Sequence, residues 1–154
     1  MNKLFLISTL LILGFLSCNK DELSEEEQLK VDIEIIEKYL TENNLEAEKT
    51  SSGLHYIIND QGNGDFPVST DDVTVRYKGY FTDGKVFDES SQEGIRFNLQ
   101  QVIKGWTEGI PKFKEGGEGV LLIPSKLGYG SQKRQGIPAN SVLIFDVKLF
   151  IVHN

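Results

Sequence analysis

Residues 101–111, QVIKGWTEGIP, decide how this chain folds, because they combine its only tryptophan with a short helical pattern. Four apolar side chains are spaced to share one face of a helix little more than two turns long: Val102, Ile103, Trp106 and Ile110. So short a helix is marginal alone in water, and each glycine in its interior costs about 1 kcal/mol relative to alanine. Packing against flanking strands must therefore hold it, with Trp106 either at the bottom of a concavity or as an ordinary core residue.

The segments on both sides of this helix have the patterns of strands. Val73–Phe81 alternates apolar and polar side chains, and the Asp-Gly pair at 83–84 is a two-residue hairpin signal. Gly119–Ile123 is a continuous apolar run, which indicates a strand covered on both faces. The last strand collects apolar side chains on one face: Leu143, Phe145, Val147, Leu149 and Ile151. With Gly53–Ile58, about five strands and no βαβ alternation predict an α+β fold, a twisted antiparallel β-sheet wrapped around one short α-helix.

An N-terminal amphipathic helix is predicted to precede this sheet. Ser24 and Glu27 fit a capping box, and the acidic residues that cluster there suit the first turn of a helix. The apolar stripe consists of Leu29, Ile33, Ile36 and Leu40, widened by Val31, Ile35 and Tyr39. The helix should end near Asn43–Asn44. The sequence leaves open whether helix 25–42 packs on the body or forms a homodimer with a second copy.

Charge is distributed unevenly along the chain, whose net charge is −7. Between residues 19 and 48 there are eleven acidic residues and three lysines, whereas residues 49–154 carry twelve of each sign. A neutral body behind an acidic segment argues against nucleic-acid binding, which requires clustered Lys and Arg. The two histidines, His55 and His153, provide no zinc ligand set, and no G-x-S-x-G motif supports a Ser–His–Asp triad.

Residues 1–18, MNKLFLISTLLILGFLSC, resemble a bacterial lipoprotein signal. Lys3 gives a positive start, and Leu4–Leu16 is an apolar run too short to span a bilayer comfortably. In such signals residues 1–17 are removed and the cysteine, here Cys18, is lipidated, so we expect a membrane anchor. Phe15 and Leu16 depart from the usual pattern, and the alternative is a secretory signal followed by a free cysteine. The NKDE that follows is similar to a surface-export tag, or is simply a polar tether.

Four ordered motifs between about residues 52 and 152 resemble those of FKBP-type peptidyl-prolyl cis–trans isomerases. They are VTVRYKGYFTDGKVFDES (73–90), FNLQQVIKGWTEGI (97–110), LLIPSKLGYG (121–130) and GIPANSVLIFDVKL (136–149). The preceding helix also resembles the lead-in of exported bacterial members. We therefore expect a signal peptide at 1–17, a lipidated cysteine, acidic tether and helix at 18–48, and an isomerase domain at 49–154, anchored in the bacterial envelope on its periplasmic or surface face.

The resemblance implies a hydrophobic pocket that binds proline-containing segments of unfolded or partly folded envelope proteins. Its members would be Tyr77, Phe87 and Phe145 as walls, Trp106 as floor, Val102 and Ile103 at the rim, Asp88 facing the imide, Tyr129 as hydroxyl donor and Ile137 on the far side. The catalytic set would be Asp88, Tyr129, Phe145 and Tyr77. The backbone N–H of Ile103 would be offered to a substrate carbonyl. Taken singly, each of these residues also fits an ordinary core, strand or turn position.

Isomerisation breaks no bond, so the resemblance implies neither a cofactor nor a metal. Three departures from the family concern details of the pocket: Ile95 predicts an aliphatic wall where many members have an aromatic residue, Gln101 replaces an acidic residue, and no arginine follows Asp88. Binding of macrolide inhibitors is therefore a weaker expectation than peptide binding. The rival functions are a holdase that binds proline segments without turnover, and an accessory envelope lipoprotein that acts through its helix.

Overall fold

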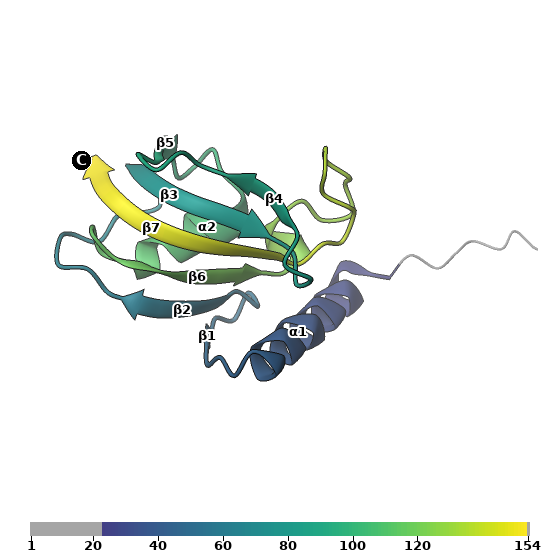
Figure 1. The fold of residues 1–154 in the computed structure, drawn as a ribbon. Helices are drawn as coiled ribbons and strands as arrows, with labels where there is room; N and C mark the ends of the chain where they lie inside the picture. Colours follow the sequence, from purple (N-terminus) through teal and green to yellow (C-terminus); the bar gives the residue numbers. More distant parts are fainter. Residues whose placement is uncertain (1–22, 154) are drawn as a thin grey trace, which may run out of the picture.

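The computed structural model describes residues 23–153, so the predicted signal segment, Cys18 and residues 19–22 lie outside the described part. A seven-stranded antiparallel sheet has the order β1-β2-β6-β7-β3-β4, with β5 also paired to β3. The sheet curves over the short helix α2 (Lys104–Gly109), and the longer α1 (Glu25–Glu42) lies outside it (Figure 1). The predicted fold class, an α+β fold with an antiparallel sheet around one short helix, is confirmed.

The sheet has two more strands than the five predicted. Its strands are β1 (Glu48–Lys49), β2 (His55–Asp60), β3 (Asp72–Tyr80), β4 (Val86–Glu89), β5 (Ile95–Asn98), β6 (Glu118–Ile123) and β7 (Leu143–His153). Two 3-10 turns, η1 (Ile110–Lys112) and η2 (Ser125–Leu127), complete the fold. The pattern of apolar and polar residues did not reveal β1 and β5, because two and four residues are too few to display alternation, and only the family resemblance placed Ile95 in a strand. Pairing with β2 and β3, respectively, defines them.

The central helix α2 has six residues rather than the predicted two turns or more. It begins directly after its N-cap, Ile103, and the hydroxyl of Thr107 donates a hydrogen bond of 2.6 Å to the carbonyl of Leu99. Pro111 has no backbone N–H, so the α-helical ladder cannot continue and the chain passes into η1. Val102 and Ile103 consequently lie in the segment before the helix, not on its face.

Two glycines let α2 lie directly on β6. A Cβ atom on Gly105 would be 2.5 Å from Cγ2 of Ile123, and one on Gly109 would be 2.7 Å from Cδ2 of Leu121. Any larger residue would hold the helix away from the sheet. The two glycines lower the helix propensity of α2, but they allow its backbone to contact β6 closely. This contact fixes the depth at which Trp106 lies.

The last strand departs from regular alternation near its end. A β-bulge at Phe150 shifts the register of β7 against β3 between the pairs made by Leu149 and Ile151. One extra residue reverses which side chains face the core. Ile151 is therefore 46% exposed, and Val152 packs against the core instead. The prediction that Ile151 shares the buried face was wrong.

The hairpin between β3 and β4 has a three-residue loop instead of the predicted two-residue turn. The N–H of Phe81 donates to the carbonyl of Lys85 at 3.0 Å, and the N–H of Gly84 donates to the carbonyl of Phe81 at 2.8 Å. Within this loop only Gly84 has a positive φ, at 83°. A two-residue type I′ turn requires positive φ at both central residues, so the chain takes the longer connection.

Helix α1 begins with the predicted capping box. The N–H of Glu27 donates to Oγ of Ser24 at 3.3 Å, and the N–H of Ser24 donates to a carboxylate oxygen of Glu27 at 3.0 Å. Asn43 caps the other end, as predicted. None of the helices within residues 23–153 is long and apolar enough to cross a membrane.

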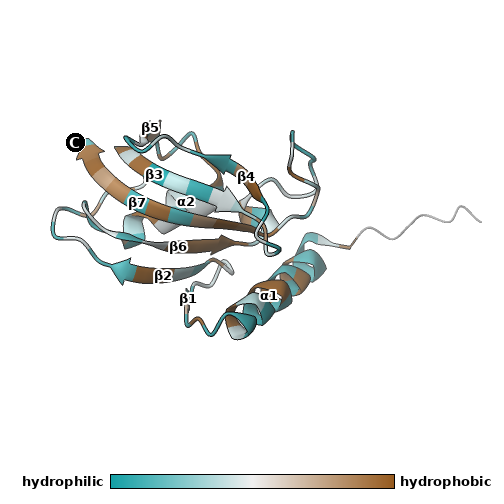
Figure 2. Ribbon diagram, viewed as in Figure 1, coloured by the Kyte–Doolittle hydropathy of each residue, from teal (hydrophilic) through white to brown (hydrophobic). Residues whose placement is uncertain are grey.

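One stripe of α1 packs on the body of the molecule, which is one of the two arrangements that the sequence left open. Ile36 and Leu40 are buried, and they form a second core cluster with Leu122, Val142 and Ile144. Hydrophobic and hydrophilic residues alternate along α1, as the brown and teal segments of the helix in Figure 2 show. Val31 and Ile35, which the sequence also assigned to the stripe, are 37% and 38% exposed.

The substitution Gly105→Ala should destabilise the protein although alanine is the better helix former. The added methyl group would collide with Ile123, and overpacking a core costs about 1–3 kcal/mol, against about 1 kcal/mol gained in propensity. The free energy of unfolding, measured by urea denaturation, should therefore fall by up to about 2 kcal/mol. In an Ile123→Ala background the same substitution should cost less. An equal cost in both backgrounds would contradict the steric explanation.

Candidate functional site

The concave side of the sheet, α2 and the loops around it enclose a groove of about 1270 Å³. All nine residues of the predicted pocket line this groove: Tyr77, Phe87, Asp88, Val102, Ile103, Trp106, Tyr129, Ile137 and Phe145. They come from strands β3, β4 and β7, from α2, and from the segments before α2 and after η2. The fold thus brings together residues that are up to about half the chain apart in sequence.

Trp106 is the centre of an aromatic cluster at the base of the groove. Its ring meets those of Tyr77, Phe97 and Phe145 edge-on, at centroid distances of 5.1, 5.4 and 5.4 Å. Phe87 in turn meets Phe145 edge-on at 5.5 Å. Edge-to-face pairs contribute about 0.5–1.5 kcal/mol each beyond the area that they bury. Mutual contacts therefore hold the rings in place before any ligand binds.

Phe97 is a wall residue that the sequence interpretation missed. Ile95 was expected to form the wall on this side, which would have been aliphatic. In the structure Ile95 pairs with Val75, is 41% exposed and does not line the groove, whereas Phe97 does. The expectation of an aliphatic wall was therefore wrong. Both residues lie on the same face of β5, and the ring of Phe97 meets that of Trp106 edge-on.

Gly79 makes room for two of the aromatic walls. A Cβ atom at this position of β3 would lie 2.7 Å from the ring of Phe87 and 2.8 Å from that of Phe145. A glycine inside a strand often marks such a close approach, and this was the available sequence signal. The two rings can pack onto the backbone of β3 only because the side chain is missing.

A hydrogen-bonded pair lies where the aromatic walls meet the solvent. The hydroxyl of Tyr77 donates to a carboxylate oxygen of Asp88 at 2.7 Å, and Asp88 itself is exposed. Two causes raise the pKa of the Tyr77 phenol far above its ordinary value of 10.0. Burial of the side chain is the larger cause, and the hydrogen bond to Asp88 is the second. Tyr77 therefore stays protonated, and it orients the carboxylate of Asp88 beside the groove.

Hydrogen-bond donors are available at the rim. Ile103 has an extended backbone, with φ −61° and ψ 148°, and its carbonyl accepts from the N–H groups of Trp106 and Thr107. No residue among 23–153 accepts a hydrogen bond from the N–H of Ile103. On the opposite side the Tyr129 ring is half-buried and lies 5.6 Å from the guanidinium of Arg134.

Helix α1 reaches the edge of the groove, which the sequence did not indicate. Glu25, in the first turn of α1, lines the groove and lies 3.6 Å from the ammonium of Lys126. The rim also carries Lys104 and Arg134, so charged side chains surround an apolar interior. The described residues 23–153 contain no group of three or more His, Cys, Asp or Glu side chains that could hold a metal ion.

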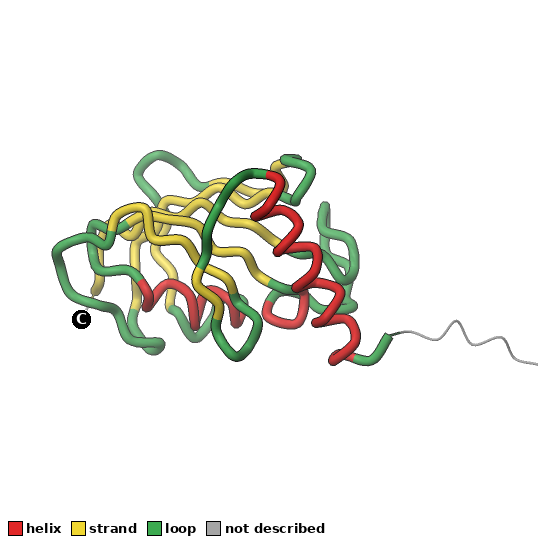
Figure 3. The backbone as a smooth tube through the Cα atoms, turned by 90° about the horizontal axis from the view of Figure 1, so that it is seen from below, coloured by secondary structure: helices red, strands yellow, loops and turns green. Residues whose placement is uncertain are grey.

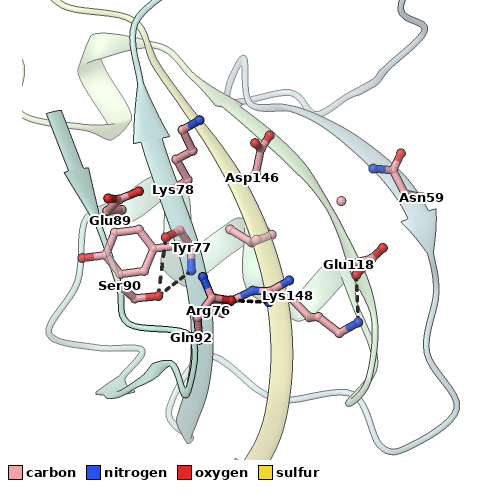
Figure 4. Close-up of a pocket in the computed structure, with 12 residues that line it drawn as sticks. Asn59, Arg76, Tyr77, Lys78, Glu89, Ser90, Gln92, Glu118, Asp146 and Lys148 are labelled. Atoms are coloured by element: carbon pink, nitrogen blue, oxygen red, sulfur yellow. Dashed lines mark hydrogen bonds and ion pairs between the residues drawn. The ribbon is translucent and has the colours of Figure 1, made fainter. Parts of the chain in front are cut away.

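A second hollow, of about 340 Å³, lies on the outer face of the sheet. Figure 4 shows that charged side chains project into it from neighbouring strands: Arg76, Lys78, Glu118, Asp146 and Lys148. Lys148 and Glu118 form an ion pair at 2.9 Å. Opposite charges that neutralise one another on an exposed face do not favour a particular ligand, so the candidate functional site is the aromatic groove.

Neither histidine belongs to the groove. The ring of His55 lies 3.0 Å from the carbonyl of Gly53, and that of His153 lies 2.9 Å from the hydroxyl of Thr74. A Ser–His–Asp arrangement, for which the sequence offers no motif, therefore has no counterpart among the groove residues either.

Comparison with known proteins agrees with this geometry. The family described as FKBP-type peptidyl-prolyl cis-trans isomerase matches residues 64–150. The chain belongs to this family. A probable FKBP-type peptidyl-prolyl cis-trans isomerase FkpA of Neisseria meningitidis is 48% identical over 118 residues, which are 73% of this chain and 43% of that protein. FkpA of Escherichia coli is 44% identical over 118 residues, again 43% of its length. The chain thus spans less than half the length of these curated relatives.

Solved structures show the same fold. The crystal structure of FkpA from Escherichia coli superimposes with a TM-score of 0.71 at 34% identity, covering 85% of this chain and 74% of that chain. A crystal structure of a peptidyl-prolyl cis-trans isomerase from Pseudomonas syringae superimposes with a TM-score of 0.73 at 28% identity, covering 86% and 98%. The FKBP fold of the body therefore rests on both sequence and structure.

The raised pKa of Tyr77 should make the protein less stable in alkali. Because the phenol keeps its proton longer in the folded state, the unfolded state loses protons first as the pH rises above 10.0. The resulting stability is fully present below that pH and is lost as the pH rises towards the folded pKa. The free energy of unfolding, measured between about pH 9 and 11, should fall more steeply for the wild type than for Tyr77→Phe.

Part of the slope should remain in this variant, because burial and the charge of Asp146 also raise the pKa of Tyr80. Parallel curves for the wild type and Tyr77→Phe would show that Tyr77 titrates normally in the folded protein.

Proposed function

We propose that this chain catalyses cis–trans isomerisation of X-Pro peptide bonds in unfolded or partly folded polypeptides. The observation that carries the proposal is the preformed aromatic pocket around Trp106, with the hydrogen-bonded pair of Tyr77 and Asp88 at its edge. A proline ring is compact and apolar and lacks an N–H, so it can enter such a pocket without leaving a polar group unsatisfied.

The pocket suits the transition state of this reaction better than water does. Rotation about the peptide C–N bond faces a barrier of about 18–20 kcal/mol, because resonance gives the bond partial double-bond character. The twisted imide has lost this resonance and has less charge separation than the planar form. An apolar site therefore favours the twisted form over the planar one, and this difference in binding is what accelerates the reaction.

The groups at the edge would hold the peptide in its twisted form. Tyr129 and the N–H of Ile103 donate to peptide carbonyl oxygens on either side of the proline. The carboxylate of Asp88, oriented by Tyr77, faces the rotating bond and acts electrostatically. Phe145 completes the apolar wall against which the ring turns. Because no bond is broken, the proposed mechanism requires no nucleophile, metal or cofactor.

Loss of Asp88 and Tyr129 should abolish most of the catalysis without unfolding the protein. Exchange of a short X-Pro-Phe peptide, measured by NMR with the full chain in detergent, should be faster with the wild type than without protein. One hydrogen bond contributes about 0.5–1.5 kcal/mol, so the double variant Asp88→Ala/Tyr129→Phe should slow catalysed exchange by roughly tenfold or more. The rate falls because both groups stabilise the peptide more strongly in its twisted form than in its planar form.

The sheet offers a matched control on its other face, where the hydroxyl of Tyr80 donates to Asp146 at 2.9 Å. The variant Asp146→Ala/Tyr80→Phe removes the same chemical groups outside the groove and should retain the wild-type rate. If the protein binds the peptide but does not accelerate its exchange, the holdase is the remaining function of the groove. If the protein neither binds the peptide nor accelerates exchange, the result favours an accessory protein that acts through helix 25–42.

We also propose that the mature protein is exported and anchored in the bacterial envelope through a lipid on Cys18. The support is the sequence of residues 1–18, with its positive start, short apolar run and cysteine. Durable anchoring requires more than one acyl chain, since a single chain binds membranes only marginally. Clients would then be exported proteins that fold near the membrane.

The substitution Cys18→Ala should release the protein from the membrane if this anchor exists. Wild-type protein from cells fed labelled palmitate should carry the label and sediment with membranes, whereas the variant should carry none. Ser17→Ala, which keeps the cysteine and a small residue before it, serves as the control. Equal labelling of Cys18→Ala and wild type would refute lipidation at this residue.

Two further predictions remain open. A homodimer through helix 25–42 would have to use the exposed side chains of Val31 and Ile35, because Ile36 and Leu40 pack on the body.

Binding of macrolide inhibitors, implied by the family resemblance, would use the same aromatic groove as the peptide.

A further inference from the structure

Asp32 is a buried acidic residue that the proposed chemistry does not use. It lies on α1, has no exposed surface, and accepts three hydrogen bonds: from Nε2 of Gln28 at 2.7 Å, from the backbone N–H of Ser125 at 2.7 Å and from Oγ of Ser125 at 2.6 Å. Burying a carboxyl group is unfavourable unless hydrogen bonds replace its water. The three bonds provide that replacement, and two of them join α1 to a segment 93 residues away.

Ser125 begins the turn that presents Tyr129. Its carbonyl accepts the N–H of Gly128 at 2.9 Å and the N–H of Gly130 at 2.8 Å. These are the two residues on either side of Tyr129. Asp32 occupies both donors of Ser125, so every polar group of this serine is engaged either with α1 or with the backbone around Tyr129.

The contact forms a short, continuous path from α1 to the rim of the groove. Helix α1 contacts η2, the turn that begins at Ser125, and Figure 3 shows α1 running along the outside of the sheet towards a short helical turn. Nearby, Glu25 and Lys126 form a second link at 3.6 Å, but both side chains are largely exposed, and such pairs contribute little. The buried contact of Asp32 is therefore the stronger of these two links between α1 and the turn.

We propose that Asp32 is a positioning residue for isomerisation, which holds the Tyr129 hydroxyl at the rim by fixing Ser125. This inference rests on the proposed function, because it assigns Tyr129 a role towards bound peptide. It makes α1 part of the isomerase unit rather than only a spacer between the body and the N-terminus. Without Asp32, the turn loses its anchor and the hydroxyl of Tyr129 samples positions in which it cannot donate to a peptide carbonyl.

A purely structural role of Asp32 would also lower activity if it merely loosened α1, so the test requires a control. Ile36, one turn further along α1, is fully buried in the cluster that docks the helix. Its side chain is apolar, so it forms no hydrogen bond with Ser125. Ile36→Ala should therefore weaken docking of α1 while leaving the bonds of Ser125 in place.

The experiment compares Asp32→Ala, Asp32→Asn, Ile36→Ala, Tyr129→Phe and Asp32→Ala/Tyr129→Phe in the full chain. Asp32→Ala should reduce kcat/KM for an X-Pro-Phe peptide by about three- to tenfold, the effect of one lost hydrogen bond. In the Tyr129→Phe background it should cost less than about twofold, because the hydroxyl that it positions is gone. Ile36→Ala should lower the melting temperature and keep kcat/KM within about twofold of the wild type.

Amide hydrogen exchange provides a readout that does not depend on activity. The N–H groups of Gly128 and Gly130 should exchange faster in Asp32→Ala than in the wild type, and remain protected in Ile36→Ala. Asp32→Asn keeps the shape and one acceptor oxygen, so it should fold even if Asp32→Ala does not, and it should show a smaller change in both readouts.

Equal losses of kcat/KM from Asp32→Ala with and without the Tyr129 hydroxyl would overturn the proposal. So would an equal loss in Ile36→Ala, or unchanged protection of Gly128 and Gly130 when Asp32 is replaced. A wild-type protein that does not accelerate exchange would instead refute the proposed function, and the amide protection would still show whether Asp32 fixes the turn.

Discussion

The close contact between α2 and β6 is the constraint on which the rest of the groove depends. Gly105 and Gly109 bring the helix onto the strand, and this sets the depth of the Trp106 ring. On β3, which is separated from β6 by β7 in the same sheet, Gly79 lets Phe87 and Phe145 pack against the backbone. Three positions without a side chain thus shape the apolar site as strongly as the rings that line it. A larger residue at any of them would move a wall or the floor.

The strand β6 connects the two sides of the molecule. Leu121 faces the core around α2, and the adjacent Leu122 belongs to the cluster that docks α1. Coverage from both sides explains why this segment is a continuous apolar run instead of an alternating one. The same strand leads directly into the turn at Ser125, so the floor of the groove, the docking of α1 and the placement of Tyr129 share one element.

Much of this could be predicted from the sequence where local signals suffice. The capping box at Ser24, the apolar run of β6 and the ordered motifs identified the helix, the fold class and nine groove residues. Features that depend on pairing could not be predicted in this way. The bulge at Phe150 exists only against β3, and Phe97 rather than Ile95 forms a wall because of the position of β5. A polar helical residue such as Asp32 gives no local sign of burial, because its partner is distant in sequence.

If Cys18 carries the lipid that we propose, the position of Glu25 at the edge of the groove limits the distance between the groove and the membrane. Glu25 follows Cys18 by seven positions along the chain, and an extended chain covers at most about 3.3–3.6 Å per residue. With the lipid on Cys18 that we propose, the mouth of the groove would lie within about 25 Å of the bilayer surface. The protein would then meet polypeptides in the layer of water next to the lipid headgroups, and clients deeper in the surrounding compartment would have to diffuse to it.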